Sequence, residues 1–565
     1  MAKIHTLKIK NYRGIHEFEQ IFGTTNFICL IGRGDSGKTT ILQAINIVLY
    51  PNWNYTFTDT DFFNGEINNP IEIEVSLYDL PFELLTDSKF GLYKRLLNSE
   101  GKIIDDISQE DSEDNKDILT IKLKVEKDLE PKWVVTNNRE NQEDIEIRSS
   151  DRAKLNVFLV SDYIDKHFTW SKGNPLYSLL KQENIENTTD EIITKAYRDA
   201  KSNIDTTSFT PFNDIVEKVK QAASNLGLLI EKPITSIDFK NTFIKEGNIS
   251  LYDNNIPLRL KGKGSKRLLS IAIQLELAKQ GGIILIDEIE QGLEPDRVKF
   301  LAKKLKDSNN GQVFITTHSS DILVELDAKD IFLMRKNNSS LFVFNEDFQG
   351  TIRKAPEAFF AKKIIVCEGA TEIGICRTLN EYLISKEEKN LSFLGVALAD
   401  GTGNTFVNYC EKFKEAGFDV CAFCDSDNEG INNKKPALQN KGISIIDCED
   451  KNAIEQQLFS DLPWKKVKQL LEYAVDEKTE QCILSATGKK KIDDILNNDT
   501  SEIRILLGEK AKGYKKENGK KVEGWYKRID HGEFIGKLWF ESLKELEGKK
   551  LKFQYEELVK WINKA

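Results

Sequence analysis

The first residues with the means to do chemistry form the turn GRGDSGKTT. An apolar run, FICLI, precedes this turn, and apolar residues at helical spacing follow it. In a strand, glycine-rich turn and helix, backbone N–H groups converge on phosphate oxygens. Lys38 would reach the terminal phosphates and the Thr39 hydroxyl would hold Mg²⁺, whereas a chance match would lack the flanking strand and helix. The turn therefore predicts a nucleotide site formed by Gly32, Asp35, Ser36, Gly37, Lys38, Thr39 and Thr40.

Further polar residues that suit a nucleotide site lie between residues 258 and 320. The apolar run IILI ends in Asp287 and Glu288. A carboxylate at the end of a buried strand can hold the hydration shell of Mg²⁺, and its neighbour can polarise the attacking water. A glycine-rich turn, KGKGSKR, precedes this run, and a later strand-like run ends in His318. A lone histidine is more often structural than catalytic.

A separate set of acids follows apolar runs after residue 360. Glu368 ends the run KIIVC, Glu372 begins the next helical pattern, and Asp425 and Asp427 follow the run DVCAFC. Carboxylates at the carboxyl ends of neighbouring parallel strands raise one another's pKa, and a bound divalent cation removes that penalty. Each acid alone is most simply a solvated loop residue. The set together predicts a site for Mg²⁺ or Mn²⁺.

Length and composition limit the class of protein. A chain of 565 residues predicts two to four domains, and 40% hydrophobic with 30% charged residues is typical of a globular protein. The sequence has neither an apolar run of about 20 residues nor a secretory h-region, so we expect a cytoplasmic protein and no membrane partner. Eight sparse cysteines fit a reducing compartment, and Cys421 and Cys424 are interpreted as small core residues. The net charge of −10 leaves room for a local basic groove.

A basic segment lies near the C-terminus. Residues 509–528 carry eight basic and three acidic residues, with Tyr514, Trp525 and Tyr526 among them. Basic residues interleaved with aromatic ones suit a phosphate backbone with exposed bases, and a solvated lysine-rich loop is an equally good interpretation. Two earlier segments are of other kinds: 105–117 is acidic and predicts a solvated hairpin or disordered loop, and 174–231 is helical in pattern.

The order of phosphate loop, glycine-rich turn, Asp-Glu strand and strand-end histidine resembles ABC-type ATPases of the SMC and RecF group. The resemblance implies that ATP bridges a dimer, with a signature sequence from one subunit closing on the nucleotide of the other. The residues that this assigns to the signature are Gly262, Gly264 and Ser265, although Lys261 replaces the usual serine. It also places Arg13 near the nucleotide, Asp61 in a loop that senses the γ-phosphate and residues 292–294 in the D-loop.

The Glu-Gly pair followed by Asp-x-Asp resembles the TOPRIM domain of topoisomerases, primases and some nucleases. An ATPase followed by TOPRIM is similar to the OLD family of ATP-dependent nucleases, including the nuclease subunits of bacterial anti-phage systems such as Gabija. The metal ligands that this resemblance implies are Glu368, Glu372, Asp425, Asp427 and Glu455. It implies an assisting lysine as well, for which Lys527 is preferred to Lys537, and Asp400 is a further ligand or a neighbour of one.

The expected fold is therefore α/β. An ABC-type ATPase domain is predicted over 1–355, with a helical dimerisation insertion at about 160–235, and a TOPRIM nuclease domain with a C-terminal helical extension over 356–565. The expected function is that of an ATP-binding and ATP-hydrolysing, metal-dependent endonuclease that is regulated by nucleotide and acts in bacterial anti-phage defence. DNA is favoured over RNA as the substrate, and the expected partners are a second copy or larger homo-oligomer and a helicase or other defence subunit. The alternatives are an RNA-cleaving TOPRIM effector and a non-catalytic ATP-gated DNA clamp.

Overall fold

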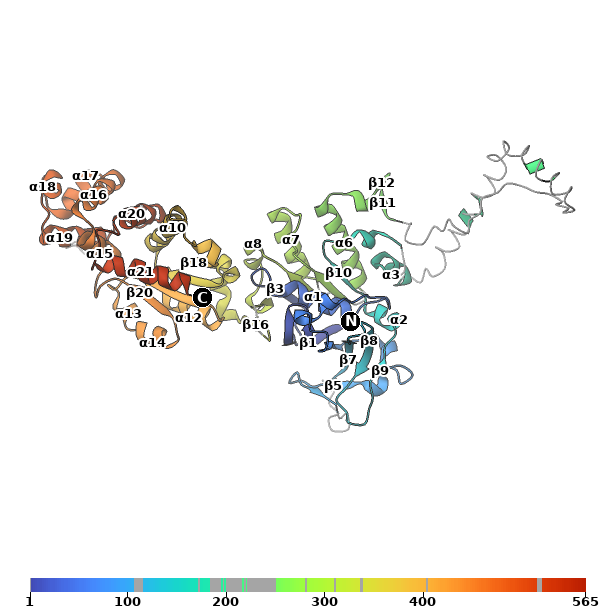
Figure 1. Cartoon of the computed structure of the whole chain (residues 1–565). Coiled ribbons are helices and arrows are strands. Elements are labelled where there is room, and N and C mark those ends of the chain that lie inside the picture. The colour runs from blue at the N-terminus through green and yellow to red at the C-terminus, as the bar shows by residue number, and fades with distance from the viewer. Residues whose placement is uncertain are drawn as a thin grey trace. The chain divides into compact units, whose positions relative to one another are not determined.

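The computed structural model describes most of the chain (Figure 1). The described residues are 2–105, 115–170, 173–182, 250–279, 282–308, 311–335, 339–402, 405–515 and 521–564, with a few isolated positions between 183 and 249. Most of the acidic segment 105–117 and most of the predicted helical insertion therefore lie outside the described residues. Among the helices that are described, none is both long and apolar enough to cross a membrane.

The described chain divides into two compact units. The first contains residues 1–30, 37–317 and 336–341, and the second contains 31–36, 318–335 and 342–565. The predicted division at residue 355 and the dimerisation role of the insertion remain predictions.

The first unit contains an antiparallel sheet with the strand order β2-β1-β4-β7-β5-β6, to which β8 and β9 are added beside β7. In β1, Lys8 and Lys10 are exposed while Ile9 between them is buried, as expected for a sheet with one solvated face. The strands are β1 (Lys3–Tyr12), β2 (Ile15–Ile21), β4 (Ile71–Tyr78), β5 (Arg95–Leu97), β6 (Ile103–Ile104), β7 (Lys116–Val125), β8 (Pro131–Thr136) and β9 (Ile145–Glu146).

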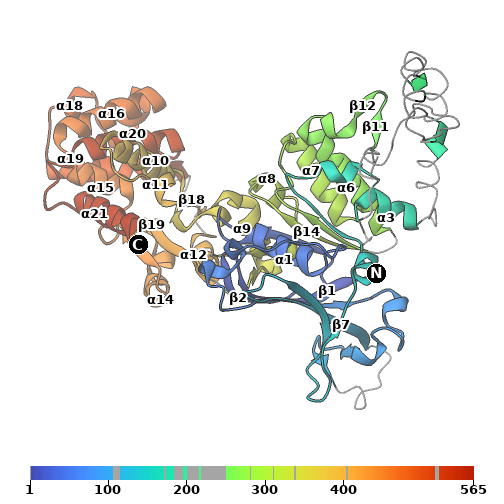
Figure 2. The ribbon, with the colours of Figure 1, turned by 45° about the vertical axis from the view of Figure 1, so that its right-hand side comes forward.

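A parallel sheet in the same unit leads to Lys38 and Asp287 of the nucleotide motifs. Its strands β10 (Val157–Val160), β13 (Ile283–Ile286), β14 (Gln312–Thr316) and β3 (Phe27–Ile31) pair in that order. All residues of β3, β13 and β14 are buried, which explains the continuous apolar sequences of β3 and β13. The two polar residues of β14, Gln312 and Thr316, are hydrogen-bonded. Helix α1 (Lys38–Val48) contacts strands of both sheets and so forms a layer between them (Figure 2).

The remaining elements of the first unit surround these sheets, and α6 contacts β10 and β13. They are α2 (Ser149–Arg152), α3 (Pro175–Gln182), β11 (Tyr252–Asp253), β12 (Ile256–Pro257), α6 (Lys263–Ala278) and α7 (Pro295–Lys306).

The second unit is built on a four-stranded parallel sheet with the order β18-β17-β19-β20. The strands are β17 (Lys363–Cys367), β18 (Val396–Asp400), β19 (Asp419–Cys424) and β20 (Ser444–Asp447). Helix α12 (Phe406–Glu415) contacts β17 and β19, and α10 (Ala370–Ser385) contacts β17 and β18. Each strand is followed by a loop or helix that begins at the same edge of the sheet, and this edge carries the predicted acids.

A helical region completes the second unit and shares one apolar core with the sheet. Its helices are α13 (Glu429–Asn432), α14 (Lys435–Asn440), α15 (Ile454–Asp461), α16 (Trp464–Lys478), α17 (Glu480–Thr487), α18 (Asp493–Leu496), α19 (Ser501–Ala511), α20 (Ile529–Glu541) and α21 (Lys550–Asn563). The smaller elements are α8 (Ser320–Leu323), β15 (Ile331–Leu333), β16 (Phe342–Val343), α9 (Gln349–Lys354), α11 (Leu391–Leu394), β21 (Gly513–Lys515) and β22 (Lys521–Glu523).

Helices α10 and α20 cross with their backbones in contact. A Cβ atom added to Gly532 would collide with the carbonyl oxygen of Thr371, and one added to Gly374 would collide with that of Ile529. The Thr378 hydroxyl also donates a hydrogen bond of 2.9 Å to the Glu533 carbonyl across the crossing. Glycine is therefore required for the two helices to lie this close.

Candidate active site

The phosphate loop adopts the backbone conformation that its glycines allow. Gly37 caps the N-terminus of α1 with φ 100°, and Gly32 has φ 145°, both in the region that favours glycine. Asp35 has a positive φ of 59° as well. Lys38 is the first residue of α1 and is only 5% exposed, and a helix N-terminus is a position where phosphate is favoured.

Asp287 lies beside the helix that follows the phosphate loop. The Thr39 hydroxyl donates to Asp287 Oδ1 over 3.1 Å, and the Thr316 hydroxyl donates to the same oxygen over 2.7 Å. The ends of α1, β13 and β14 thus meet, although Thr39 and Asp287 are 248 positions apart. A hydroxyl and a carboxylate in contact are the donor set expected for Mg²⁺ with nucleotide.

The backbone of Glu288 is held on both sides. Its N–H donates to the Thr316 hydroxyl over 2.6 Å, and its carbonyl accepts from Arg267 Nη2 over 2.8 Å. Glu288 has φ 48°, a left-handed conformation that costs free energy in a residue with a side chain. Burial lowers the pKa of Arg267, although the nearby charge of Asp287 opposes this. Sequence reasoning missed Arg267 and Thr316. Arg267 ends the run KGKGSKR, but only Gly262, Gly264 and Ser265 of that run were assigned a role.

The predicted signature packs against the predicted D-loop within the chain. Gly262 caps α6, and a Cβ atom on Gly264 would collide with the carbonyl oxygen of Gly292, which itself has φ 75°. Lys261 forms an ion pair of 2.6 Å with Asp253, so this departure from the usual signature has a local partner. Ser265 is exposed. The action of this segment on the nucleotide of a second subunit remains a prediction.

Arg13 and Asp61, both assigned to the nucleotide by resemblance, contact each other. Arg13 Nε donates to Asp61 Oδ1 over 2.9 Å, and the guanidinium also donates to Gln43 of α1. Their pairing links the end of β1 to the helix after the phosphate loop. His318 is exposed, and its ring lies 6.4 Å from that of Phe360 within the second unit. The contacts of Thr40, Arg13, Asp61 and His318 with a bound nucleotide remain predictions.

The acids of the second unit meet at the carboxyl edge of its parallel sheet. Glu368, which follows β17, accepts a hydrogen bond of 3.0 Å from the backbone N–H of Asp425 through Oε2. Asp425 follows β19, and its Oδ1 accepts a hydrogen bond of 2.7 Å from the backbone N–H of Ile454. Glu372 lies in the first turn of α10 and is 5% exposed. Four segments of the chain therefore converge on this edge.

Crowding and burial of the carboxylates raise their pKa values. Burial, and then the charges of Glu455 and Glu368, raise the pKa of Glu372 to about 7. Burial also raises the pKa of Asp425, with contributions from Glu372, Glu455, Glu368 and Asp427. The same causes act on Glu368, whose pKa is raised by burial and by Asp427. The exposed Asp427 is thus close enough to act on the other acids.

Glu455 is the most deeply buried acid of the set. Its side chain is fully buried, and Oε1 accepts a hydrogen bond of 2.7 Å from Lys527 Nζ. Its Oε2 has no hydrogen-bond partner among the described residues. An unpartnered carboxylate oxygen in a buried acidic cluster fits a cation. As the side chains stand, however, no three described His, Cys, Asp or Glu residues are arranged to hold a metal ion.

Lys527 is the basic member of this cluster. Burial alone would lower the pKa of Lys527, but the charges of Glu455, Asp425 and Glu372 outweigh burial and raise it. Lys537, the other candidate for the assisting lysine, is exposed on α20 and lines a pocket that contains none of these acids. Asp400 ends β18 and accepts a hydrogen bond of 2.9 Å from the Thr402 N–H.

A further lysine that sequence reasoning missed supports the Asp425 loop. Lys435 Nζ donates to the Asp425 carbonyl and to the Ser426 hydroxyl, each over 3.1 Å, and to Asp447 Oδ2 over 2.8 Å. Lys435 lies ten residues after Asp425 and is not part of a recognised motif. Only the return of the chain at α14 brings its ammonium group under the loop.

The interpretation that Trp525 and Tyr526 stack on exposed nucleic acid bases is wrong. Trp525 is 3% exposed and Tyr526 is fully buried, and both belong to the apolar core of the second unit. The Tyr526 hydroxyl donates to the Leu470 carbonyl over 2.7 Å. The side chain of Tyr514 lies outside the described residues. Cys421 and Cys424 are buried, as predicted for small core residues.

Two stretches of the chain match known domain families. Residues 27–325 match the family described as "AAA domain, putative AbiEii toxin, Type IV TA system", which is more than half of the 565 residues. The chain belongs to this AAA family. Residues 359–427 match the family described as "Overcoming lysogenization defect protein-like, TOPRIM domain".

The two matches confirm the predicted order of domains. An ABC-type ATPase domain precedes an OLD-like TOPRIM domain, as in an OLD-family ATPase–nuclease, and the ATPase domain implies that the chain binds nucleotide. The likeness to anti-phage subunits such as those of Gabija remains a prediction.

Solved structures similar to this chain include heads of SMC proteins and RecF. An SMC head bound to the C-winged helix domain of ScpA is 17% identical, with a TM-score of 0.33, and the match covers 61% of this chain and 99% of that one. An SMC head bound to ScpA derived from Pyrococcus furiosus is 15% identical over 62% and 98%, with a TM-score of 0.34. The recombination mediator RecF with ATP is 13% identical over 60% and 99%, with a TM-score of 0.34. No curated protein sequence matches this chain.

Proposed function

We propose that this protein is an ATP-regulated, metal-dependent endonuclease that cleaves phosphodiester bonds in DNA. The observation that carries the proposal is Glu455, a fully buried acid with one oxygen on Lys527 and the other without a partner among the described residues. A buried unpaired carboxylate oxygen among like charges calls for a cation. The residues that would hold Mg²⁺ or Mn²⁺ are Glu368, Glu372, Asp425, Asp427 and Glu455.

The chain's own side chains would bind and polarise the substrate. A pair of divalent cations bound by these acids would supply an activated water and would stabilise charge on the attacking and leaving oxygens of an in-line displacement. Lys527 keeps its proton at neutral pH, because the acids around it raise its pKa, and its ammonium group can neutralise charge that develops on the phosphate. The Asp425 backbone N–H donates a hydrogen bond to Glu368, so the Glu368 carboxylate is held beside the loop that carries Asp425.

The ATPase domain would regulate this chemistry. Lys38 and Thr39 would bind the phosphates and Mg²⁺ of ATP, Asp287 would hold the cation's hydration shell, and Glu288 would polarise the attacking water. We propose a homodimer or larger homo-oligomer, in which the segment around Gly264 closes on the partner's nucleotide. A helicase or other defence subunit would complete the assembly, in the bacterial cytoplasm and against phage DNA.

Two other functions use the same domains. A TOPRIM effector that cleaves RNA would use the same acids, since nothing in the acid set reads the sugar. A non-catalytic clamp on DNA would use ATP alone, but it would have no need of a buried acid such as Glu455 beside Lys527. The acid set therefore favours a nuclease over a clamp.

The decisive assay offers both polymers to the purified protein. Plasmid DNA and total RNA are incubated with Mg²⁺, Mn²⁺ or EDTA, with and without ATP, using wild type, Glu455→Gln and Glu449→Gln. Glu449 is an exposed acid on the loop before α15 and serves as the matched control. We expect DNA cleavage in Mg²⁺ or Mn²⁺ by wild type and Glu449→Gln only. Cleavage of RNA alone would select the ribonuclease, and intact polymers throughout would select the clamp.

A further inference from the structure

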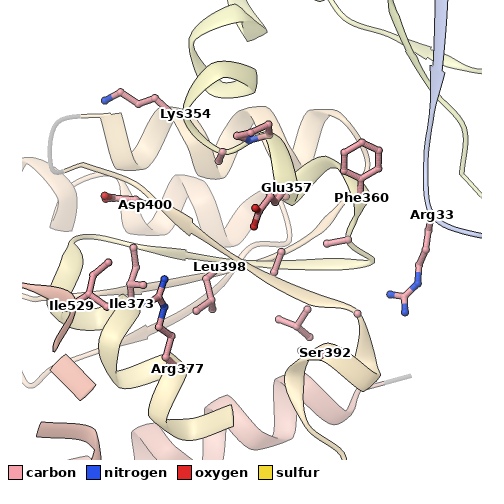
Figure 3. A pocket seen from close by; sticks show the side chains of 17 residues that line it. Arg33, Lys354, Glu357, Phe360, Ile373, Arg377, Ser392, Leu398, Asp400 and Ile529 are labelled. Carbon is pink, nitrogen blue, oxygen red and sulfur yellow. The ribbon is translucent and has the colours of Figure 1, made fainter. Parts of the chain in front are cut away.

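A pocket runs along β18, the edge strand of the second unit's parallel sheet (Figure 3). Its volume is about 770 Å³, and its lining includes the apolar side chains of Ile373 and Leu398. It is lined from Gly395, just before β18, to Asp400, the last residue of that strand. At about 3.3 Å per residue, the strand alone spans about 13 Å, so the pocket is elongated. We call it the trough.

Cationic side chains are distributed along this trough. Figure 3 shows Lys354 and Asp400 at one end and Arg33 at the other, with Arg377 and Glu357 between them. The lining thus holds three cations and two acids. Spaced cations beside apolar side chains suit a chain of phosphates that are joined by sugars carrying bases.

Neither Arg377 nor Lys354 forms a strong interaction with a neighbouring side chain. Arg377 forms an exposed ion pair of 3.4 Å with Glu533, and such surface pairs contribute little free energy. Lys354 Nζ donates to the Thr402 hydroxyl over 3.3 Å, a neutral contact that a phosphate can replace. Both ammonium and guanidinium groups are therefore able to turn to an anion in the trough.

The end of the trough adjoins the acid set. Asp400 of β18 is in register with Cys367 of β17, and Glu368 is the next residue after Cys367. From this we propose that the trough holds the phosphodiester backbone of a single nucleic acid strand beside the bond to be cut, with Arg377 and Lys354 on its phosphates. The inference rests on the proposed nuclease function and names a positioning role for residues outside the acid set.

The test measures binding separately from cleavage. Fluorescence anisotropy follows short labelled single strands of DNA and of RNA with the same sequence, in EDTA and over a series of salt concentrations. The proteins are wild type, the double variant Arg377→Gln with Lys354→Gln, the charge-retaining Arg377→Lys, and Lys560→Gln. Lys560 is exposed on α21 outside the trough and is the matched control.

The double variant should bind at least about fivefold more weakly than wild type, and its slope of log affinity against log salt should be smaller by about 1.4. Arg377→Lys and Lys560→Gln should bind within about twofold of wild type. An unchanged affinity and salt slope in the double variant would overturn the trough but leave the nuclease standing. Wild type that cuts a polymer but binds neither strand would also overturn it. Failure of cleavage in the separate assay above removes the nuclease itself.

Discussion

Lys527 Nζ donates a hydrogen bond of 2.7 Å to Oε1 of Glu455, which is fully buried. The two residues lie 72 positions apart, one before α20 and the other in the first turn of α15. The two aromatic residues before Lys527, Trp525 and Tyr526, are buried in the core of the second unit. They anchor the chain at this point, so the lysine is held over the acids by packing.

Lys527→Met should lower cleavage by at least about 100-fold, because it removes the ammonium group beside the acids and leaves Glu455 buried without a partner. Lys537→Met should cleave like wild type, since Lys537 is exposed on α20. The measurement is the rate of plasmid cleavage at saturating Mg²⁺ or Mn²⁺, with melting temperatures to show that both variants fold. A defect in Lys537→Met alone would exchange the two assignments.

Cleavage should require a divalent cation and the acids of the second unit. Asp425→Ala and Glu368→Ala should each lose cleavage, because each removes a carboxylate that would bind the cation. Both should still bind ATP with the wild-type affinity, since the nucleotide motifs belong to the other domain. Cleavage by purified Asp425→Ala protein in EDTA would refute a metal mechanism.

Lys38→Ala should abolish nucleotide binding, because backbone N–H groups alone hold phosphate charge less well. Glu288→Gln should bind ATP but hydrolyse it at least about 100-fold more slowly. Equilibrium binding of a fluorescent ATP analogue and phosphate release measure the two steps. Lys303→Ala, at an exposed position of α7, is the control that should match wild type in both. Unchanged hydrolysis in both test variants would remove the ATPase assignment.

ATP should slow cleavage, because a phosphodiesterase that is always active would endanger the host's own nucleic acid. An ABC-type dimer closes on ATP and opens after hydrolysis, so ATP can shift the population between two shapes. Cleavage is compared for wild type and Glu288→Gln, each without nucleotide and with millimolar ATP. Four equal rates would show that the sites are uncoupled. Acceleration of wild type but not of Glu288→Gln would show that hydrolysis drives cleavage.

The stability of the first unit should fall as pH drops below about 6.5. Burial lowers the pKa of His167 from 6.5 to about 4, and its Nδ1 lies 2.6 Å from the Ser270 hydroxyl. The folded chain therefore favours the neutral ring. Its contribution is complete above pH 6.5 and is lost as pH falls toward 4, by roughly 3 kcal/mol in total. His167→Asn should melt with a flatter pH dependence between 7 and 5, and superimposable pH profiles would contradict this origin.

Short-range patterns were enough to predict the ends of buried strands. The runs before Gly32, Asp287, Glu368 and Asp425 all form parallel strands, so the sequence located the residue that follows each of these strands. The two matched families confirm the ATPase and TOPRIM domains that these motifs indicated. The roles of the individual residues are still predictions.

Contacts between segments that are distant in the sequence could not be predicted from short-range patterns. Arg267 and Lys435 hold the backbones of Glu288 and Asp425, yet neither was predicted to do so, because a hydrogen bond to a carbonyl requires no particular neighbours in sequence. Tyr526 was misinterpreted for the related reason that aromatic residues in a basic segment suit a core and a nucleic acid equally. Only the packing of α16 and α20 around it decides that it is buried.

The backbone contact between α10 and α20 limits how this protein can be altered by selection. Helix α10 carries Glu372, and α20 begins two residues after Lys527. In a saturation library, Gly374 and Gly532 should return as glycine alone, because any larger residue would collide with the facing carbonyl group. Adaptive changes in substrate preference should therefore gather at exposed positions such as Arg377, where a new side chain leaves the spacing of the two helices untouched.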